Sequence, residues 1–133
     1  MRGDLNPDAF AVDRWQSADA GWTFLDDAGP LFIGGLTFST AWSGTLWLIG
    51  HERVDALNDQ SWRKLVRQTR TVVSNALDPA NPHARRRIDA HVMSGWPAAR
   101  RLVQHLGFEH EGTCRHAGSG GEDFEIWARV ARR

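Results

Sequence analysis

The sequence predicts a mixed α/β domain with the element order β-β-β-α-β-α-β-β. Two patterns along the chain support this order. Residues 22–50 carry aromatic and branched aliphatic side chains in short runs separated by turn residues, as in a β-meander. From residue 62 the apolar side chains recur at intervals of three and four, which is typical of an amphipathic helix. Strands on both sides of this helix predict one parallel strand pair in an otherwise antiparallel sheet.

The meander consists of three predicted strands. They span residues 22–25, 30–38 and 45–50, with turns between them. The second strand contains the pair Gly34 and Gly35, and glycines inside a strand indicate either a bulge or a close backbone approach.

The first helix is expected over residues 62–76. Asn58, Asp59 or Ser61 can cap its start, because short polar side chains accept hydrogen bonds from the free amides of a first turn. Its end is expected at Asp78, because a proline follows directly and cannot continue the helix.

The C-terminal part of the chain is predicted to hold the remaining elements. Residues 88–93 alternate like a strand, and Pro97 suits the first position of a second amphipathic helix. Gly107 is a natural residue to end that helix in the left-handed conformation. Residues 111–116 and 122–130 are expected to form a closing hairpin around a glycine-rich loop.

Length and composition indicate an ordinary globular protein. The 133 residues fit one domain, expected over 21–133, preceded by a poorly ordered or short N-terminal segment over 1–20. The formal net charge of zero excludes a general nucleic-acid or membrane-surface binder. Cys114 is the single cysteine, so no internal disulfide framework is expected. No signal peptide and no apolar run of about 20 residues is visible, and we expect a cytoplasmic location.

The segment 97–112, with the sequence PAARRLVQHLGFEHEG, resembles the penultimate helix of the GNAT N-acetyltransferases. In that superfamily a helix ending in Leu-Gly-Phe is followed by Glu-Gly and a last hairpin. The resemblance covers about residues 22–130 and implies a GNAT-like fold with a truncated N-terminal region. A narrower resemblance is to the GNAT-like proteins of bacteriophages, in which a tryptophan-containing strand, here 46–50, leads into an arginine-rich helix.

The resemblance implies acetyl-CoA as cofactor. The pantetheine arm would lie along the backbone of Leu48, Ile49 and Gly50. The phosphates would lie at the start of the long helix, at Asn58, Gln60 and Ser61. The stretch 51–61 departs from the family, because it has no glycine and places two aspartates near the phosphates. A like charge at about 4 Å costs about 1–4 kcal/mol at effective dielectrics of 80 to 20. The cofactor loop is therefore degenerate.

The resemblance also locates the catalytic groups. Glu52 and His51, at the end of the central strand, are the candidates for a general base. The family's usual acid is a tyrosine in the penultimate helix, and Val103 stands at that position. Substitutes that can donate or accept a proton in this region are these residues: Cys114, Ser94, His91 and His110.

Two functions follow from these observations. The first is an acetyl-CoA-dependent N-acyltransferase. The alternative is a catalytically inactive assembly or interaction module, such as a bacteriophage virion or accessory protein. For the alternative, exposed tryptophans would contact protein partners, and those in loops or on uncovered faces are these: Trp15, Trp42, Trp96 and Trp127.

Two further clusters have a simpler explanation than function. Cys114 and His116 lie near His105 and His110, but their spacing matches no standard zinc pattern, and we expect no metal. The run 85–87 of three arginines either binds phosphate or forms a solvated turn.

Overall fold

The computed structural model describes residues 20–26, 29–50 and 56–131. Almost all of the predicted N-terminal segment 1–20 thus lies outside the described residues. The elements follow the predicted order. They are β1 (Ala20–Asp26), β2 (Gly29–Phe38), β3 (Ser43–Gly50), α2 (Asp59–Leu77), β4 (Arg87–Met93), α3 (Pro97–His105), β5 (Glu109–Cys114) and β6 (Phe124–Val130).

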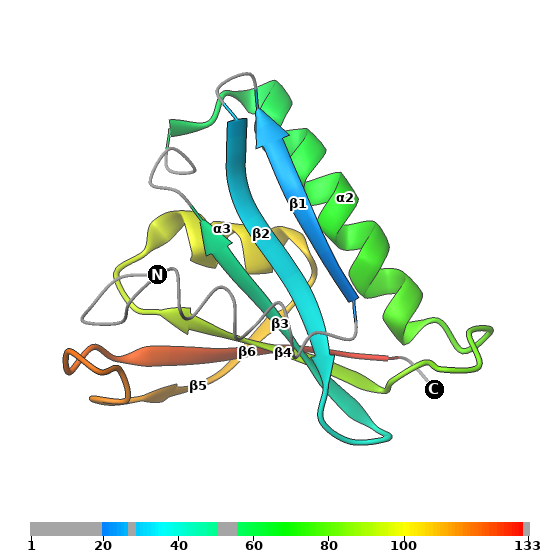
Figure 1. The fold of residues 1–133 in the computed structure, drawn as a ribbon. Helices are drawn as coiled ribbons and strands as arrows, with labels where there is room; N and C mark the ends of the chain where they lie inside the picture. The colour runs from blue at the N-terminus through cyan, green and yellow to red at the C-terminus, as the bar shows by residue number, and fades with distance from the viewer. Residues whose placement is uncertain (1–19, 27–28, 51–55, 132–133) are drawn as a thin grey trace.

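All six strands form one sheet in the order β1-β2-β3-β4-β6-β5. The pairing of β3 with β4 is parallel and every other pairing is antiparallel, which confirms the predicted mixed sheet. Figure 1 shows β1 and β2 crossing β4 and β6 at a steep angle. A strong twist therefore divides the sheet into two arms that meet at the parallel pair.

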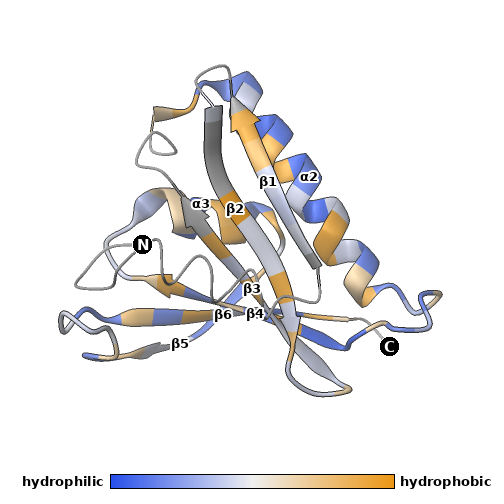
Figure 2. Ribbon diagram, in the orientation of Figure 1, coloured by the Kyte–Doolittle hydropathy of each residue, from blue (hydrophilic) through white to orange (hydrophobic). Residues whose placement is uncertain are grey.

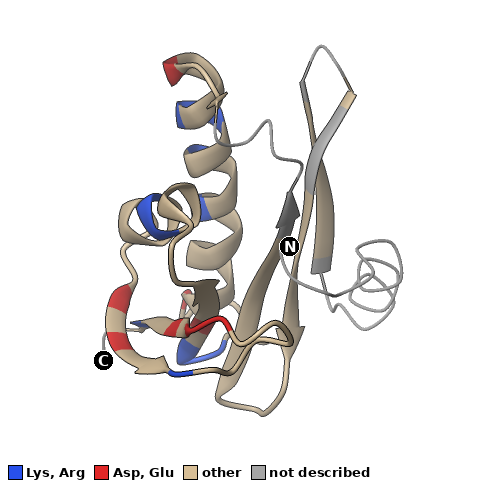
Figure 3. Ribbon diagram, turned by 90° about the vertical axis from the view of Figure 1, so that its left-hand side faces the viewer, with Lys and Arg blue, Asp and Glu red and all other residues tan. Residues whose placement is uncertain are grey.

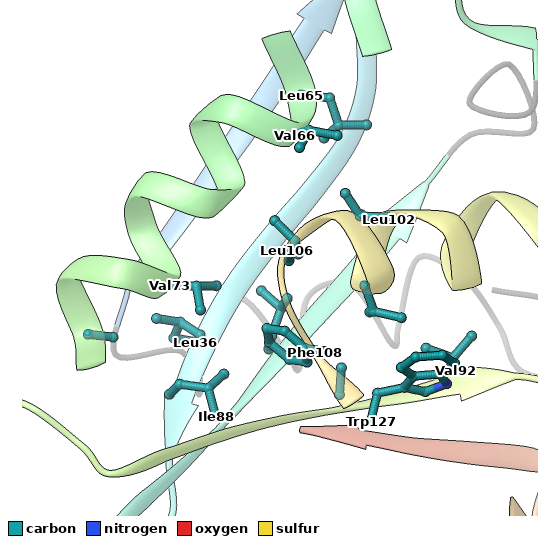
Figure 4. Close-up of a cluster of buried hydrophobic side chains, with 14 of the residues drawn as sticks. Leu36, Leu65, Val66, Val73, Ile88, Val92, Leu102, Leu106, Phe108 and Trp127 are labelled. Atoms are coloured by element: carbon teal, nitrogen blue, oxygen red, sulfur yellow. The ribbon is translucent and has the colours of Figure 1, made fainter. Parts of the chain in front are cut away.

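Both helices cover the same face of the sheet, as the side view in Figure 3 shows. The core lies between them and this helix face, and Figure 4 shows side chains of α2 and α3 pointing toward the strands. Five side chains in this core are each at most 1% exposed: Leu65 and Val73 on α2, Leu106 directly after α3, and Leu36 and Ile88 on the strands. Burying such a side chain contributes about 1.5–3 kcal/mol, so this one-sided core anchors the helices to the sheet.

Helix α2 is amphipathic, as the apolar spacing predicted. Figure 2 shows hydrophilic residues along its outer side, and Trp62, Leu65 and Val66 on the inner side are buried. Asn58 is its cap, because the Asn58 side chain accepts a hydrogen bond of 2.8 Å from the amide of Ser61. The helix begins three residues earlier than its apolar pattern, since polar first-turn residues carry no core-facing signal.

Gly34 meets its neighbours closely and forms no bulge. The register between β1 and β2 runs unbroken through Gly34, and its irregularity lies at Phe24 and Leu25 instead. A Cβ at Gly34 would lie 2.6 Å from Cδ2 of Leu48 and 2.8 Å from two ring atoms of Trp22. Of the two explanations for the glycine pair, the close approach is therefore correct for Gly34.

The end of α3 is fixed by two arginines. Gly107 has a φ of 83°, the predicted left-handed residue after the helix. Arg70 of α2 donates to the carbonyl oxygen of His105, and Arg129 of β6 donates to that of Leu106 over 3.4 Å. These contacts satisfy carbonyls that a helix end leaves free, and they link α3 to both neighbouring elements.

The last hairpin lies slightly off its predicted bounds. Strand β5 begins at Glu109 because Phe108 still donates its amide to Val103 of the helix turn, and the strand follows directly. Strand β6 begins at Phe124 because Glu122 belongs to the loop, where its carbonyl and side chain accept from the amides of Gly118 and Gly120.

Candidate functional site

The parallel pairing of β3 and β4 is short. It joins Ser43 through Leu46 to Arg87 through Ala90, and among the described residues no further pair connects the two strands. Beyond this point β3 stays paired to β2 and β4 stays paired to β6. The strands therefore part in the middle of the sheet, and main-chain groups of β3 face the gap without a ladder partner in the part of the chain that the structure describes.

The gap opens into a cavity of about 630 Å³. This volume lies within the range of about 300–1,000 Å³ that is usual for small-molecule pockets. Residues of β3, β4, α3 and the last hairpin line it, and they are mainly apolar. The cavity thus lies beside Leu48, one of the three residues predicted to hold the pantetheine arm.

The cavity reaches both faces of the sheet. Leu48 and Val92 line it from the helix face, and their neighbours Trp47 and His91 line it from the other face, because successive strand residues alternate. We call this other face, turned away from α2 and α3, the second face. A bound molecule can therefore extend from one face to the other through the gap.

The structure separates the four predicted proton-transfer candidates. His91 and Cys114 line the cavity, and both are exposed. Ser94 and His110 do not belong to its lining: the Ser94 hydroxyl donates to Glu125 over 3.3 Å, and the His110 ring packs edge-on against Trp127 at 5.3 Å. Of the four candidates, two are thus placed to act on a ligand in the cavity.

Val103 occupies the position that the resemblance gives to the family's tyrosine. It is 3% exposed, lies on α3 and lines the cavity. This position therefore faces the cavity, but the valine side chain has no proton to donate.

Glu125 is a buried carboxylate that the sequence did not reveal. It is 5% exposed and lies beneath α3. It accepts hydrogen bonds from Arg100 of α3, from Ser94 over 3.3 Å and from the indole of Trp127 over 3.0 Å. The hydrogen bonds of Arg100 lower the pKa of Glu125 against the opposing effect of burial, so this carboxylate stays charged. It ties α3 to β4 and β6, and so fixes one wall of the cavity.

The predicted cofactor and base residues have different outcomes. His51 and Glu52 lie outside the described residues. Leu48 lines the cavity, whereas Ile49 and Gly50 are placed by their backbone pairing to β2. Their roles toward a cofactor stay predictions.

At the start of α2 the polar residues serve the helix. Asn58 and Ser61 are joined by the capping hydrogen bond, which takes up the Ser61 amide, and Gln60 is exposed. Their contact with phosphates also stays a prediction.

The arginine run 85–87 makes three separate contacts. The guanidinium of Arg85 lies 4.2 Å over the ring of Phe38, and that of Arg86 lies 4.8 Å over the ring of Trp42. Arg87 forms a paired contact with Glu111, at 2.9 and 2.6 Å, and this interaction lowers the pKa of the Glu111 carboxyl. Because the three guanidinium groups have separate contacts, the run stabilises this end of the sheet and does not form one shared anion site.

The described tryptophans do not gather into an exposed patch. Trp42 is 60% exposed, whereas Trp47, Trp62 and Trp127 are buried, and Trp22 and Trp96 are half-buried. Trp127 does lie on the strand face opposite Phe124, as predicted. Its side chain is buried in the core between the sheet and the helices, so no further partner is needed to cover it. Trp15 lies outside the described residues.

The described residues were also compared with what a metal site and a membrane span require. They contain no group of three or more His, Cys, Asp or Glu side chains arranged to hold a metal ion. Within the same residues, neither helix has the length and apolar character needed to cross a membrane.

The six-stranded mixed sheet with one parallel pair, together with the two helices, matches the fold of the GNAT acetyltransferases. Solved structures match over nearly the whole chain. The ribosomal-protein-S5-alanine acetyltransferase of Vibrio fischeri aligns with a TM-score of 0.67 and 10% identity, over 98% of this chain and 77% of that one. A spermidine N-acetyltransferase variant from Vibrio cholerae aligns with a TM-score of 0.62 and 13% identity, over 92% and 72%.

A GNAT-family acetyltransferase from Streptococcus pneumoniae aligns with a TM-score of 0.63 and 18% identity, over 92% of this chain and 74% of that one. No protein-family model matches the chain, and no curated protein matches it in sequence. At these identities the likeness concerns the fold, and the chemistry has to be argued from this chain's own residues.

Proposed function

We propose that this chain is an acetyl-CoA-dependent N-acyltransferase with a degenerate cofactor loop. The observation that carries the proposal is the parting of β3 and β4 beyond Leu46 and Ala90 around a cavity of about 630 Å³. A sheet normally closes such a gap, because unpaired main-chain groups away from water are costly. An occupant that hydrogen-bonds to the strand edge would remove this cost.

The helix-face half of the cavity suits the pantetheine arm of acetyl-CoA. Its walls include Leu48, Val92, Leu102 and Val103, which match the apolar parts of the arm. The arm also carries amide groups, and these would pair with the free main-chain edge of β3. Bound there, acetyl-CoA would supply an acetyl thioester at the gap.

Positive charge is available at the start of α2 for the phosphates of the cofactor. The guanidinium of Arg101 on α3 lies 4.5 Å over the ring of Trp62 in the first turn of α2. Arg63 and Lys64, the next two residues along the helix, are exposed. Together with the helix dipole, these cations would offset the acidic residues of the degenerate loop.

The transfer itself forms an N–C bond, breaks the C–S bond and moves one proton from the amine nitrogen to the released sulfur. His91 lines the cavity on the second face, where the amine would approach, and its imidazole would accept the amine proton. Cys114 lies in the same lining and is the other titratable side chain among its described residues. Because Val103 has no proton to donate, the released sulfur would take its proton from another donor, such as water.

The first test is binding of acetyl-CoA, measured by thermal shift and calorimetry. Saturable stabilisation is expected, about 2.7 kcal/mol at 100 times the dissociation constant. Arg101→Gln should weaken binding, and Arg115→Gln, at the exposed turn after β5, is the matched control. An absence of binding at millimolar acetyl-CoA overturns the proposal.

The second test concerns the proton. His91→Gln should lower kcat/KM by about 10²–10⁴-fold without changing acetyl-CoA affinity, a range typical of general-base removal. His110→Gln is the control, because that ring packs on Trp127 away from the cavity lining. Equal losses in both variants would refute the role of His91.

A second candidate function is the inactive assembly module, of the kind predicted for a bacteriophage protein. The observation that favours it is Trp42, which is 60% exposed in the turn between β2 and β3. Without acetyl-CoA binding, a Trp42→Ser variant that loses self-association or partner binding would support this function. Trp42→Ser is expected to leave acetyl transfer unchanged if the chain is an enzyme.

A further inference from the structure

We propose that the second-face half of the cavity takes an acceptor that combines an aromatic or aliphatic body, a primary amine and a neutral hydrogen-bond-accepting oxygen, and that polyamines are poor acceptors. That this ligand receives an acetyl group rests on the function proposed above. The site itself rests on the side chains of this half of the cavity and is tested separately.

The first observation is the character of the walls. The second-face residues of the lining include the apolar side chains of Trp47, Met93, Phe124 and Ile126. No described residue of the lining carries a carboxylate. A polyamine carries several ammonium groups, and moving one from water into apolar surroundings without an opposite charge is strongly unfavourable. An apolar body with a single reacting amine suits these walls.

The second observation is a pair of polar atoms without partners. The indole Nε1 of Trp47 and the hydroxyl of Thr37 are both buried, and neither makes a hydrogen bond. Trp47 is only 9% exposed, and both residues belong to the cavity lining. A buried polar group without a partner is rare in proteins and marks a place where a ligand or water completes the structure.

The two atoms belong to one small region of the second face. Trp47 lies opposite Gly35 of β2, and Thr37 is the next β2 residue on the same face. Because Gly35 has no side chain, nothing from β2 crosses in front of the Trp47 ring at that position. The neighbouring hydroxyl of Thr45 differs, since it donates to Asp89 over 2.7 Å.

The chemistry of these groups selects the ligand. An indole N–H only donates hydrogen bonds, and an ammonium group also only donates, so a polyamine cannot satisfy Trp47. A carbonyl oxygen accepts hydrogen bonds, so it matches the indole donor of Trp47 and also the hydroxyl donor of Thr37. The ligand class is therefore an amine with a carbonyl or similar oxygen on its apolar body.

Two matched amines test the inference. β-Aminopropiophenone carries a ketone, and phenylpropylamine has a methylene in its place, with the same ring, chain and amine. The indole resonance of Trp47 is followed in a proton–nitrogen correlation spectrum of the free protein, and Trp47→Phe identifies it. We expect a saturable downfield shift with β-aminopropiophenone and little response to phenylpropylamine or spermidine.

Affinities measured by calorimetry give the second readout. The ketone should bind about three- to tenfold more tightly than its methylene analogue, as one or two neutral hydrogen bonds imply. Thr37→Val should reduce this preference, and Trp42→Phe, on an exposed tryptophan outside the lining, should preserve it. Valine has nearly the same volume as threonine, so Thr37→Val still tests the preference for the ketone if Trp47→Phe does not fold.

The outcomes separate the two proposals. If acetyl-CoA binds but the Trp47 resonance ignores both amines, or follows both equally, the inference is wrong and the acyltransferase function stands. If the ketone is preferred but acetyl-CoA does not bind, the ligand site stands and the acyltransferase function is wrong. Tighter binding of spermidine than of the ketone also overturns the inference.

Discussion

Substituting Glu125 with glutamine tests whether this carboxylate holds the cavity wall in place. The carboxylate lies beneath α3 and accepts hydrogen bonds from Arg100, Ser94 and Trp127. Glutamine has nearly the same shape, but one of its two terminal atoms donates instead of accepting. The side chain can therefore no longer serve donors on both sides.

The magnitude follows from which contacts survive. With its oxygen toward Trp127, the amide keeps that hydrogen bond, and the Ser94 hydroxyl can rotate to accept from the amide nitrogen. The contact with Arg100 is then lost in part, and this half-exposed guanidinium can turn to water. The loss of one charge-assisted interaction to a buried carboxylate predicts a destabilisation of about 1–2 kcal/mol for Glu125→Gln at neutral pH.

The pH dependence gives the stronger test. Because the folded protein lowers the pKa of Glu125, its contribution is complete above the unfolded value and is lost as pH falls through the folded value. The difference in unfolding free energy between wild type and Glu125→Gln should thus be full at pH 7 and shrink steadily below about pH 4, near the unfolded value of a glutamate. Urea denaturation at several pH values measures it. A difference that is absent at pH 7, or constant with pH, would refute the reasoning.

Three further predictions concern the cavity and its surroundings. Val103→Tyr restores a proton donor at a lining position and should raise kcat about tenfold over Val103→Phe, a modest part of what general acids supply. Gly34→Ala places a Cβ 2.6 Å from Leu48 and should destabilise the fold by about 1–3 kcal/mol in urea denaturation, whereas a change below 0.5 kcal/mol would contradict the close approach. Arg87→Gln removes the group that lowers the pKa of Glu111, and that pKa should rise when followed by carbon-detected NMR; no rise would mean that the paired contact is absent in solution.

The element order could be predicted because its signals are local. Turn residues divide the meander, helical spacing marks 62–76, and Pro97 and Gly107 bound the second helix. The parallel pair followed from topology alone, since a strand before and after a helix rejoins the sheet in the same direction. The observed element boundaries differ from the predicted ones where the terminal residue is polar, as at Asp59 and Glu122, because such residues do not contribute to the apolar pattern.

The site was harder to predict because its contacts join distant parts of the chain. Glu125 lies 25 residues from Arg100, and no spacing rule connects a strand carboxylate to an arginine on the outer side of a helix. A weak signal existed, because Glu125 shares a strand face with Trp127, and a charge beside a core residue needs a partner. The choice of His91 and Cys114 over Ser94 and His110 depends on where β3 and β4 part, which pattern alone does not reveal.

Two adjacent residues of β3 allow the division of the cavity to be tested. Leu48 faces the helices and Trp47 faces the opposite side, although both line the same cavity. Leu48 packs closely over Gly34, where a Cβ would lie 2.6 Å from its Cδ2, and it also lines the cavity, so we expect a larger side chain to take up cavity space. Leu48→Phe should therefore weaken acetyl-CoA binding by about 5- to 150-fold, which corresponds to the roughly 1–3 kcal/mol that overpacking costs.

Leu48→Met conserves the volume and should bind acetyl-CoA as the wild type does. Trp47→Phe should also bind acetyl-CoA normally while it loses the preference for an oxygen-bearing amine. The two halves of the cavity would then be separable, with the fold's strand edge holding the cofactor and side chains of the second face choosing the acceptor. The opposite result, in which Trp47→Phe abolishes acetyl-CoA binding and Leu48→Phe does not, would place the cofactor on the second face and reverse the assignment.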